Sequence, residues 1–295
     1  MEIYKPIRGI ASMYAIFLAL LFNAFIVILL KLVDSYVVYN VLKIGLILVD
    51  VYYLYYLLMD FSVKYMVYED NITISYFWGL KSTKIFYNDI MGYEISEKNI
   101  HSIKLSGIGS DKFAYGRNII DKIGTTYMYV SSNKAVLFLK TEKMCYGISP
   151  ENLDKIIDIL KQKNIDNNIK EYVPNKNVEL YKDKKFFVTL VLVSILIIIL
   201  TLNPFILYLR NAMPQQMPLT FNARFIPTDF GTSKEFAFKQ MTYGVFNMII
   251  LFCMYYAAYF SAKYDKKSAY KYLYVSLFVV LIFMFLQLRI LFKFA

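Results

Sequence analysis

The sequence predicts a helical membrane protein with five spans and a polar, strand-rich domain between the second and third spans. Hydrophobic residues make up 58% of the 295 residues, charged residues 19%, and the mean hydropathy is +0.44. A soluble domain carries roughly 45–50% apolar and about 25% charged residues. The apolar excess lies in separate blocks of about 18 residues or more, the length that a helix needs to cross a bilayer.

The five predicted spans cover residues 10–30, 39–59, 186–209, 241–262 and 272–288. The first span contains no charged residue, and at about 1.5 Å per residue its length matches a bilayer core of roughly 30 Å. It is too long for the apolar part of a signal peptide, and no small-residue cleavage pattern follows it. We therefore expect a retained helix.

Basic residues near the span ends predict the orientation in the cell membrane. They gather at three places that fall on one side of a five-span protein: Lys5 and Arg8; Lys182, Lys184 and Lys185; Lys263, Lys266, Lys267 and Lys271. The N-terminus is then cytoplasmic and the C-terminus extracellular, although four basic residues of the loop 210–240 oppose this assignment. The net charge of +11 indicates contact with anionic headgroups, which attract each basic residue by about 1 kcal/mol. A nucleic-acid partner is not expected.

The chain offers little for catalysis or metal binding. Its two cysteines, Cys145 and Cys253, and its single histidine, His101, are too few for a zinc site made of Cys and His. The common hydrolase, nucleotide-binding and metalloprotease motifs are absent from the sequence. We expect no enzyme activity, no metal and no cofactor.

Residues 61–170 are polar and rich in turn signals. Two strands are expected at 64–68 and 72–77, and others at 82–86, 92–96, 125–131, 135–140 and 144–148. Glycines 107, 109, 116 and 124 precede the later strands and indicate turns and close packing, with a phosphate cradle as the weaker alternative. A helix follows, with Ser149 as N-cap and an apolar face of Leu153, Ile156, Ile157 and Leu160.

Short strands followed by one amphipathic helix are the element order of a pleckstrin-homology-like (PH-like) barrel. The segments GIGSDKFAYG (107–116) and YGISPE (146–151) resemble the PH-like domains of bacterial membrane proteins. The resemblance implies a cytoplasmic PH-like β-barrel over 61–170, capped by its C-terminal helix, with two spans in 1–60 and three in 171–295. Such a domain would dock a cytoplasmic partner or the membrane surface, whereas lipid binding does not follow from the fold alone.

The loop 210–240 carries a second resemblance. It presents Pro218, Phe221, Asn222, Asp229, Gly231 and Lys234 in an order similar to a span–loop–span unit of Sdp-type toxin immunity proteins. Thr220 and Phe225 depart from the pattern, which has His and Gly there. The resemblance implies a binding surface for an extracellular peptide or partner.

A structural reading of the same loop remains open. Asn222 and Asp229 would cap turns, and Gly231 would supply a positive φ. Phe221, Phe225 and Phe230 would enter the membrane interface as anchors.

Polar residues inside spans are costly and therefore candidates for function. Lys43 and Asp50 are seven residues apart and share one face of the second span. Asp50, near mid-span, is expected to pair with Asn23, Asn247 or Gln287, or with Lys43 through water, in a packing role. The sequence thus favours a non-enzymatic protein of regulation or self-protection. A small transporter or transporter subunit with a polar path at Asp50 is the alternative, and the ligand and oligomeric state stay open.

Overall fold

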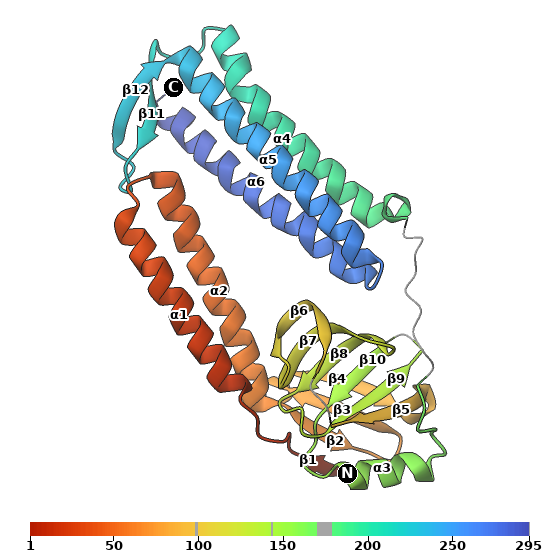
Figure 1. Ribbon diagram of the computed structural model, residues 1–295. Helices are drawn as coiled ribbons and strands as arrows, with labels where there is room; N and C mark the ends of the chain where they lie inside the picture. Colours follow the sequence, from red (N-terminus) through yellow and green to blue (C-terminus); the bar gives the residue numbers. More distant parts are fainter. Residues whose placement is uncertain (98–99, 143, 170–178, 295) are drawn as a thin grey trace. The chain divides into compact units, whose positions relative to one another are not determined.

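The computed structural model describes residues 1–97, 100–142, 144–169 and 179–294 (Figure 1). The chain divides into two compact units, one of Met1–Phe25 with Leu46–Pro174 and one of Ile26–Gly45 with Asn175–Ala295. The predicted boundary between 170 and 171 lies outside the described residues.

Within the described ranges, five helices are long and apolar enough to cross a membrane. They are α1 (Ala11–Leu32), α2 (Tyr36–Ser62), α4 (Lys184–Leu209), α5 (Ser233–Ala262) and α6 (Lys266–Phe294). Each of the five predicted spans falls on one of these helices. Helix α5 begins eight residues before the predicted span because Thr232 and Glu235 form a capping box at its start.

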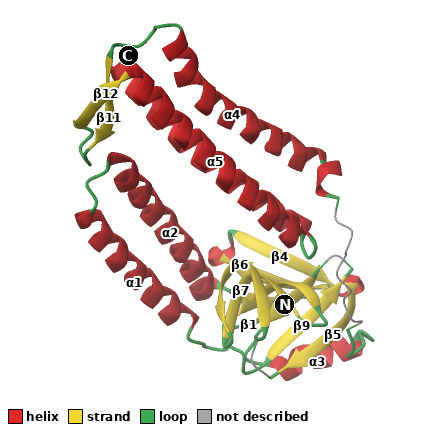
Figure 2. Cartoon of the chain, turned by 45° about the horizontal axis from the view of Figure 1, so that its top comes forward, coloured by secondary structure: helices red, strands yellow, loops and turns green. Residues whose placement is uncertain are grey.

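The strand-rich domain consists of two sheets (Figure 2). The first has the order β1-β2-β3-β4, all antiparallel: β1 (Glu2–Tyr4), β2 (Lys64–Val67), β3 (Asn71–Tyr76) and β4 (Lys81–Phe86). The second has the order β5-β9-β10-β8-β7-β6, in which β10 runs parallel to β8. Its strands are β5 (Ile90–Ser96), β6 (Ser102–Ser110), β7 (Phe113–Ile120), β8 (Gly124–Val130), β9 (Val136–Thr141) and β10 (Cys145–Ile148).

The predicted closed barrel is corrected to two separate sheets in the part of the chain that the structure describes. A 3-10 turn at Tyr87–Asp89 carries the chain from β4 into the other sheet, so β4 does not pair with β5. A shared apolar core and the buried Tyr65 side chain join the two sheets. The Tyr65 hydroxyl donates to the Tyr129 carbonyl at 2.6 Å and accepts from the Ser149 amide at 3.2 Å. Burial raises the pKa of Tyr65 to about 12.

Two predicted details of the domain are wrong. Strands β6 and β7 occupy the stretch that the glycines marked as turns. Gly107 and Gly116 face each other there with φ of +114° and +107°, and a Cβ at Gly107 would lie 1.9 Å from the Tyr115 carbonyl oxygen, so only glycine fits. The closing helix is α3 (Leu153–Gln162), and its N-cap is Asn152 rather than Ser149.

The apolar face of α3 agrees with the prediction. Ile156 and Leu160 are fully buried, and Leu153 and Ile157 pack against the same core. Ser149 is not free to cap the helix because its hydroxyl accepts a hydrogen bond from the Ser131 amide at 3.1 Å. Pro150 is likewise held before the helix, in a bridge with Pro6.

The first residues of the chain belong to this domain. We call residues 2–7 the N-terminal strap. Its β1 part pairs with β2. The strap then runs along residues 149–151, which connect β10 to α3. The Ile7 amide donates to the Ser149 carbonyl at 2.8 Å and the Glu151 amide to the Lys5 carbonyl at 2.9 Å. The Ser131 hydroxyl donates to the Ile7 carbonyl at 2.6 Å. Because α1 directly follows the strap in the sequence, these hydrogen bonds connect the domain to α1.

Asp60, near the end of α2, joins three segments of the first unit. Its carboxylate accepts a hydrogen bond from the Tyr115 hydroxyl of β7 at 2.6 Å. It also accepts from the hydroxyl and the backbone amide of Ser12, in the first turn of α1. A negative charge beside a helix N-terminus is favourable because the free amides there carry partial positive charge. One side chain therefore caps α1 and fixes the domain to the base of both helices.

The second unit packs α4, α5 and α6 with the hairpin β11 (Gln216–Phe221) and β12 (Pro227–Thr232). Pro204 lies inside α4 and has no amide to give to the Leu200 carbonyl four residues earlier. The Gln287 amide of α6 donates to that carbonyl at 2.8 Å. A neighbouring helix thereby satisfies the oxygen that the proline leaves unpaired.

We predict that Asp60→Asn weakens the attachment of the domain by about 1–3 kcal/mol, because a charged acceptor of buried hydrogen bonds is lost. The readout is labelling of Cys145 across a denaturant series, in a Cys253→Ser background. Burial raises the pKa of the Cys145 thiol to about 12, so this thiol reacts only when the domain opens.

Asp158→Asn, at an exposed carboxylate in the middle of α3, is the matched control and should behave like the wild type. If Asp60→Asn opens at the same denaturant concentration as this control, Asp60 does not hold the domain.

Candidate functional site

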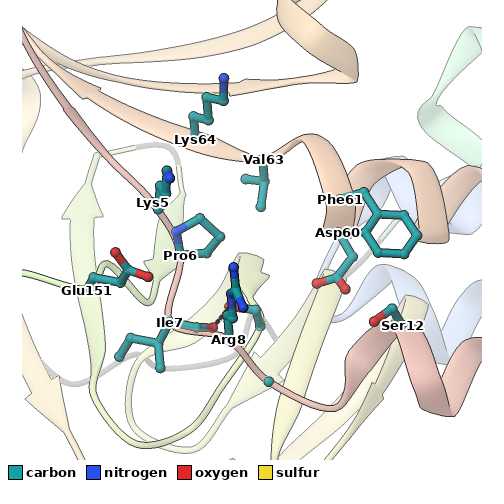
Figure 3. Close-up of a pocket in the computed structure, with 12 residues that line it drawn as sticks. Lys5, Pro6, Ile7, Arg8, Ser12, Asp60, Phe61, Val63, Lys64 and Glu151 are labelled. Carbon is teal, nitrogen blue, oxygen red and sulfur yellow. Dashed lines mark hydrogen bonds between the residues drawn. The ribbon is translucent and has the colours of Figure 1, made fainter.

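A cavity of about 590 Å³ lies where the strap, the bases of α1 and α2, and the strand-rich domain meet (Figure 3). All of its walls belong to the first unit. It is lined by Lys5, Pro6, Ile7, Arg8, Gly9, Ser12, Asp60, Phe61, Val63, Lys64, Ser131 and Glu151. We call it the junction cavity.

The charged side chains of the junction cavity differ in burial and in hydrogen bonding. Asp60 is half-buried, and Ser12 and Tyr115 hold its carboxylate. Lys5, Arg8 and Lys64 are exposed at the same cavity. Figure 3 shows Arg8 between the strap and Asp60, with Lys5 and Glu151 on the strap side.

These charges suit an anionic partner. With Asp60 bound by hydroxyl and amide donors, the three basic side chains outnumber the remaining carboxylate, that of Glu151. Chemically, the arrangement can receive an anion such as a phosphate group, because Arg and Lys supply several donors to it.

Two of the predicted polar residues of the spans pair within the first unit. Asn23 of α1 donates to the Asp50 carboxylate of α2 at 2.6 Å and to the Ala19 carbonyl at 2.9 Å. Asn247 donates to Tyr243 of its own helix, whereas Gln287 serves the Leu200 carbonyl. Lys43 is exposed on α2.

The six candidates of the outer loop lie on or beside the hairpin β11–β12. Asn222 forms its turn, because its side-chain oxygen accepts from the amides of Arg224 and Ile226, both at 3.0 Å. Pro218 is buried on β11, Asp229 is exposed on β12, and Lys234 is exposed in the first turn of α5.

Two readings of the loop are corrected. Gly231 has no positive φ. A Cβ there would lie 2.6 Å from the Leu219 Cδ1 and Glu235 Oε2 atoms, so a larger residue would have to displace the ends of these two side chains. Phe221 and Phe225 are not interface anchors, because they stack on each other at 4.7 Å inside a buried cluster with Phe294. Phe230 alone of the three is exposed, at 57%.

Sequence reasoning missed the residues that build the junction cavity. The predicted domain boundary separates Asp60 from the domain that it contacts, and the prediction groups residues 2–7 with the first span. An available signal is the Asp60 carboxylate directly after the predicted second span, since a carboxylate at the end of a membrane helix needs partners. A strap of so few residues has no readable period.

No cluster of three or more His, Cys, Asp and Glu side chains that could hold a metal ion occurs among the residues described. His101 is exposed before β6, and Cys145 is buried on β10. The expectation of no enzyme activity and no cofactor stays a prediction.

Comparison with known proteins identifies the domain. The sequence profile of the family described as Bacterial PH domain matches residues 63–164. An uncharacterised protein of Clostridium acetobutylicum is 37% identical over 260 residues, which is 88% of this chain and 88% of the relative. No solved structure matches. The predicted resemblance to toxin immunity proteins is not among these matches. The chain belongs to the same protein family as the clostridial relative, and it carries a bacterial PH domain at residues 63–164.

Proposed function

We propose that this is a non-enzymatic membrane protein with five spans, whose PH domain is a docking module fixed at the cytoplasmic membrane surface. The observation that carries the proposal is the attachment of the domain. The strap and Asp60 join it to the first turn of α1 and the last turn of α2. A domain so attached stays at the surface of any membrane that the two helices cross.

Contacts within the second unit support the sidedness. The start of α4 meets the turn between α5 and α6, where Lys266 forms a 2.8 Å ion pair with Asp183. At the opposite helix ends, the hairpin contacts both the α1–α2 turn and the end of α6. Asp34 accepts from the Ala223 amide, and the Arg289 guanidinium lies 4.3 Å from the centre of the Phe225 ring. The start of α4 and the α5–α6 turn form the group that the lysines assign to the inner side. The hairpin, the α1–α2 turn and the end of α6 form the group assigned to the outer side.

The junction cavity supports a role at a membrane surface. Helix ends lie at the level of the headgroups when a helix spans a bilayer, and Lys5, Arg8 and Lys64 lie beside two such ends. Anionic lipids attract basic residues there. We propose that these residues hold the domain toward anionic headgroups, which leaves the far side of the domain for a cytoplasmic protein partner.

The finer role is regulation or self-protection. The hairpin offers exposed Ile226, Asp229 and Phe230, which suits an extracellular peptide with apolar and basic groups. An immunity-like function rests on the resemblance of the loop alone. The transporter alternative draws no support from Asp50, because its carboxylate is bonded to Asn23.

We predict that a membrane-impermeant maleimide labels the hairpin and not the other exposed positions in intact cells. Three single cysteines test this in a Cys253→Ser background: Thr228→Cys on β12, Lys263→Cys between α5 and α6, and Lys161→Cys on α3. Only position 228 should react in intact cells, and all three should react after lysis. Reaction of position 161 or 263 in intact cells would reverse the sidedness and refute the proposal.

We predict that Asp50→Asn leaves the midpoint of thermal unfolding unchanged, since an amide oxygen can accept the same hydrogen bond from Asn23. Asp50→Leu removes the acceptor and should lower stability by about 0.5–1.5 kcal/mol. Proton flux into reconstituted vesicles is the second readout, and we expect none above that of empty vesicles. A wild-type flux that Asp50→Asn abolishes without unfolding would favour the transporter instead.

A further inference from the structure

The turn between β3 and β4 exposes apolar side chains in a strained conformation. Phe77, Trp78 and Gly79 all have positive φ, at 52°, 54° and 97°, a region that non-glycine residues rarely adopt. The conformation turns Trp78 and Leu80 outward, and they are 69% and 88% exposed. A strained turn persists only where its surroundings hold it. The segments that pack against this turn therefore show what holds it in place.

The turn packs against α2. The Phe77 amide donates to the Ser62 hydroxyl at 2.7 Å, and the ring centres of Phe77 and Tyr55 are 4.9 Å apart. The Lys81 ammonium lies 5.3 Å from the centre of the Tyr55 ring. The turn is therefore fixed beside the last two helical turns of α2, between Tyr55 and Ser62.

The length of α2 shows what lies at that height. Its 27 residues measure about 40 Å at 1.5 Å per residue, and a bilayer core is about 30 Å thick. If the Tyr36 end of α2 lies at one boundary of the core, about 10 Å of helix, or seven residues, extends beyond the other boundary. That places the core boundary near Tyr55. The helix carries four tyrosines there, at 52, 53, 55 and 56, a residue type that is frequent at a membrane–water interface. Tyr53, Tyr55 and Tyr56 also pack against the core of the domain, and the Tyr52 hydroxyl donates to the Gly107 carbonyl at 2.7 Å.

We propose that the β3–β4 turn inserts Trp78 and Leu80 into the boundary between headgroups and acyl chains of the membrane that α2 crosses. The inference rests on the proposed function, because it requires α2 to span. Trp is favoured at this depth since its ring is apolar and its N–H can reach water or headgroups. Leu80 adds apolar area, and Lys81, which is exposed directly after the turn, faces the anionic surface.

Trp78 is the single tryptophan of the chain, so its fluorescence reports on this turn alone. The full-length protein is placed in nanodiscs of phosphatidylcholine and phosphatidylglycerol, which leave both faces open to water. We expect emission at a shorter wavelength than in the denatured chain and weak quenching by iodide. Lipids with a nitroxide near the headgroup should quench strongly, and lipids with the nitroxide at the end of the acyl chain should quench less.

The matched control moves the tryptophan within the same domain. The double variant Trp78→Phe, Met91→Trp places the tryptophan on β5. That position follows the end of β4 opposite the turn, and β4 is about 17 Å long. Met91 is 58% exposed. This variant should emit at longer wavelength, respond to iodide and resist the lipid quenchers.

Two outcomes would overturn the inference. Trp78 open to iodide, while cysteine labelling still shows a spanning protein, would refute the inserted turn and leave the proposed function intact. Trp78 shielded from both iodide and lipid nitroxides would show that protein covers the turn. Release of the whole protein from membranes by alkaline carbonate would refute the proposed function itself.

Discussion

The Asp60 carboxylate is the contact on which the first unit depends. A half-buried carboxylate is costly unless donors surround it, and here the donors come from the start of α1 and from β7. Neither the start of α1 nor the domain can move away without removing a donor from this charge. The strap adds backbone pairing to the same junction. Asp60 and the strap both precede residue 63, where the match to the PH domain begins, so each of their contacts with the domain joins a residue outside the matched range to one inside it, such as Tyr115 or Ser149.

The same rule governs the polar groups of the apolar helices. Asn23 and Asp50 satisfy each other between α1 and α2. Gln287 satisfies the carbonyl that Pro204 leaves open in α4, while Gly244 of α5 comes so close to α4 that a Cβ would lie 2.0 Å from the Thr201 hydroxyl. Hydrogen bonds and close contacts of this kind are what hold helices together in a lipid environment, where burial of apolar surface offers no advantage. Polar side chains that are fully engaged in such contacts favour a structural role over a conducting path.

The sequence predicted what has a long or regular pattern. Apolar blocks located all five helices, turn signals located most strands, and the spacing of Ile156 and Leu160 located the face of α3. It missed what depends on distant partners. The strap is too short to read, Ser149 is used by Ser131 of another strand, and strands β6 and β7 contain glycines that usually indicate turns. Phe221 and Phe225 carry no mark that separates a buried stack from a membrane anchor. Asn23 was one of three amides proposed for Asp50, because single sequences do not reveal which spans adjoin.

Amide hydrogen exchange of the full chain in nanodiscs, followed for residues 2–7, tests the central claim most directly. The claim is that the PH domain is clamped to the helix pair by backbone pairing of the strap as well as by Asp60. If so, the amides of β1 and of Ile7 exchange slowly, with protection close to that of β2 and β3, because they open only when the domain itself opens. Exchange of the strap as fast as an unpaired terminus, with β2 and β3 still protected, would contradict the account.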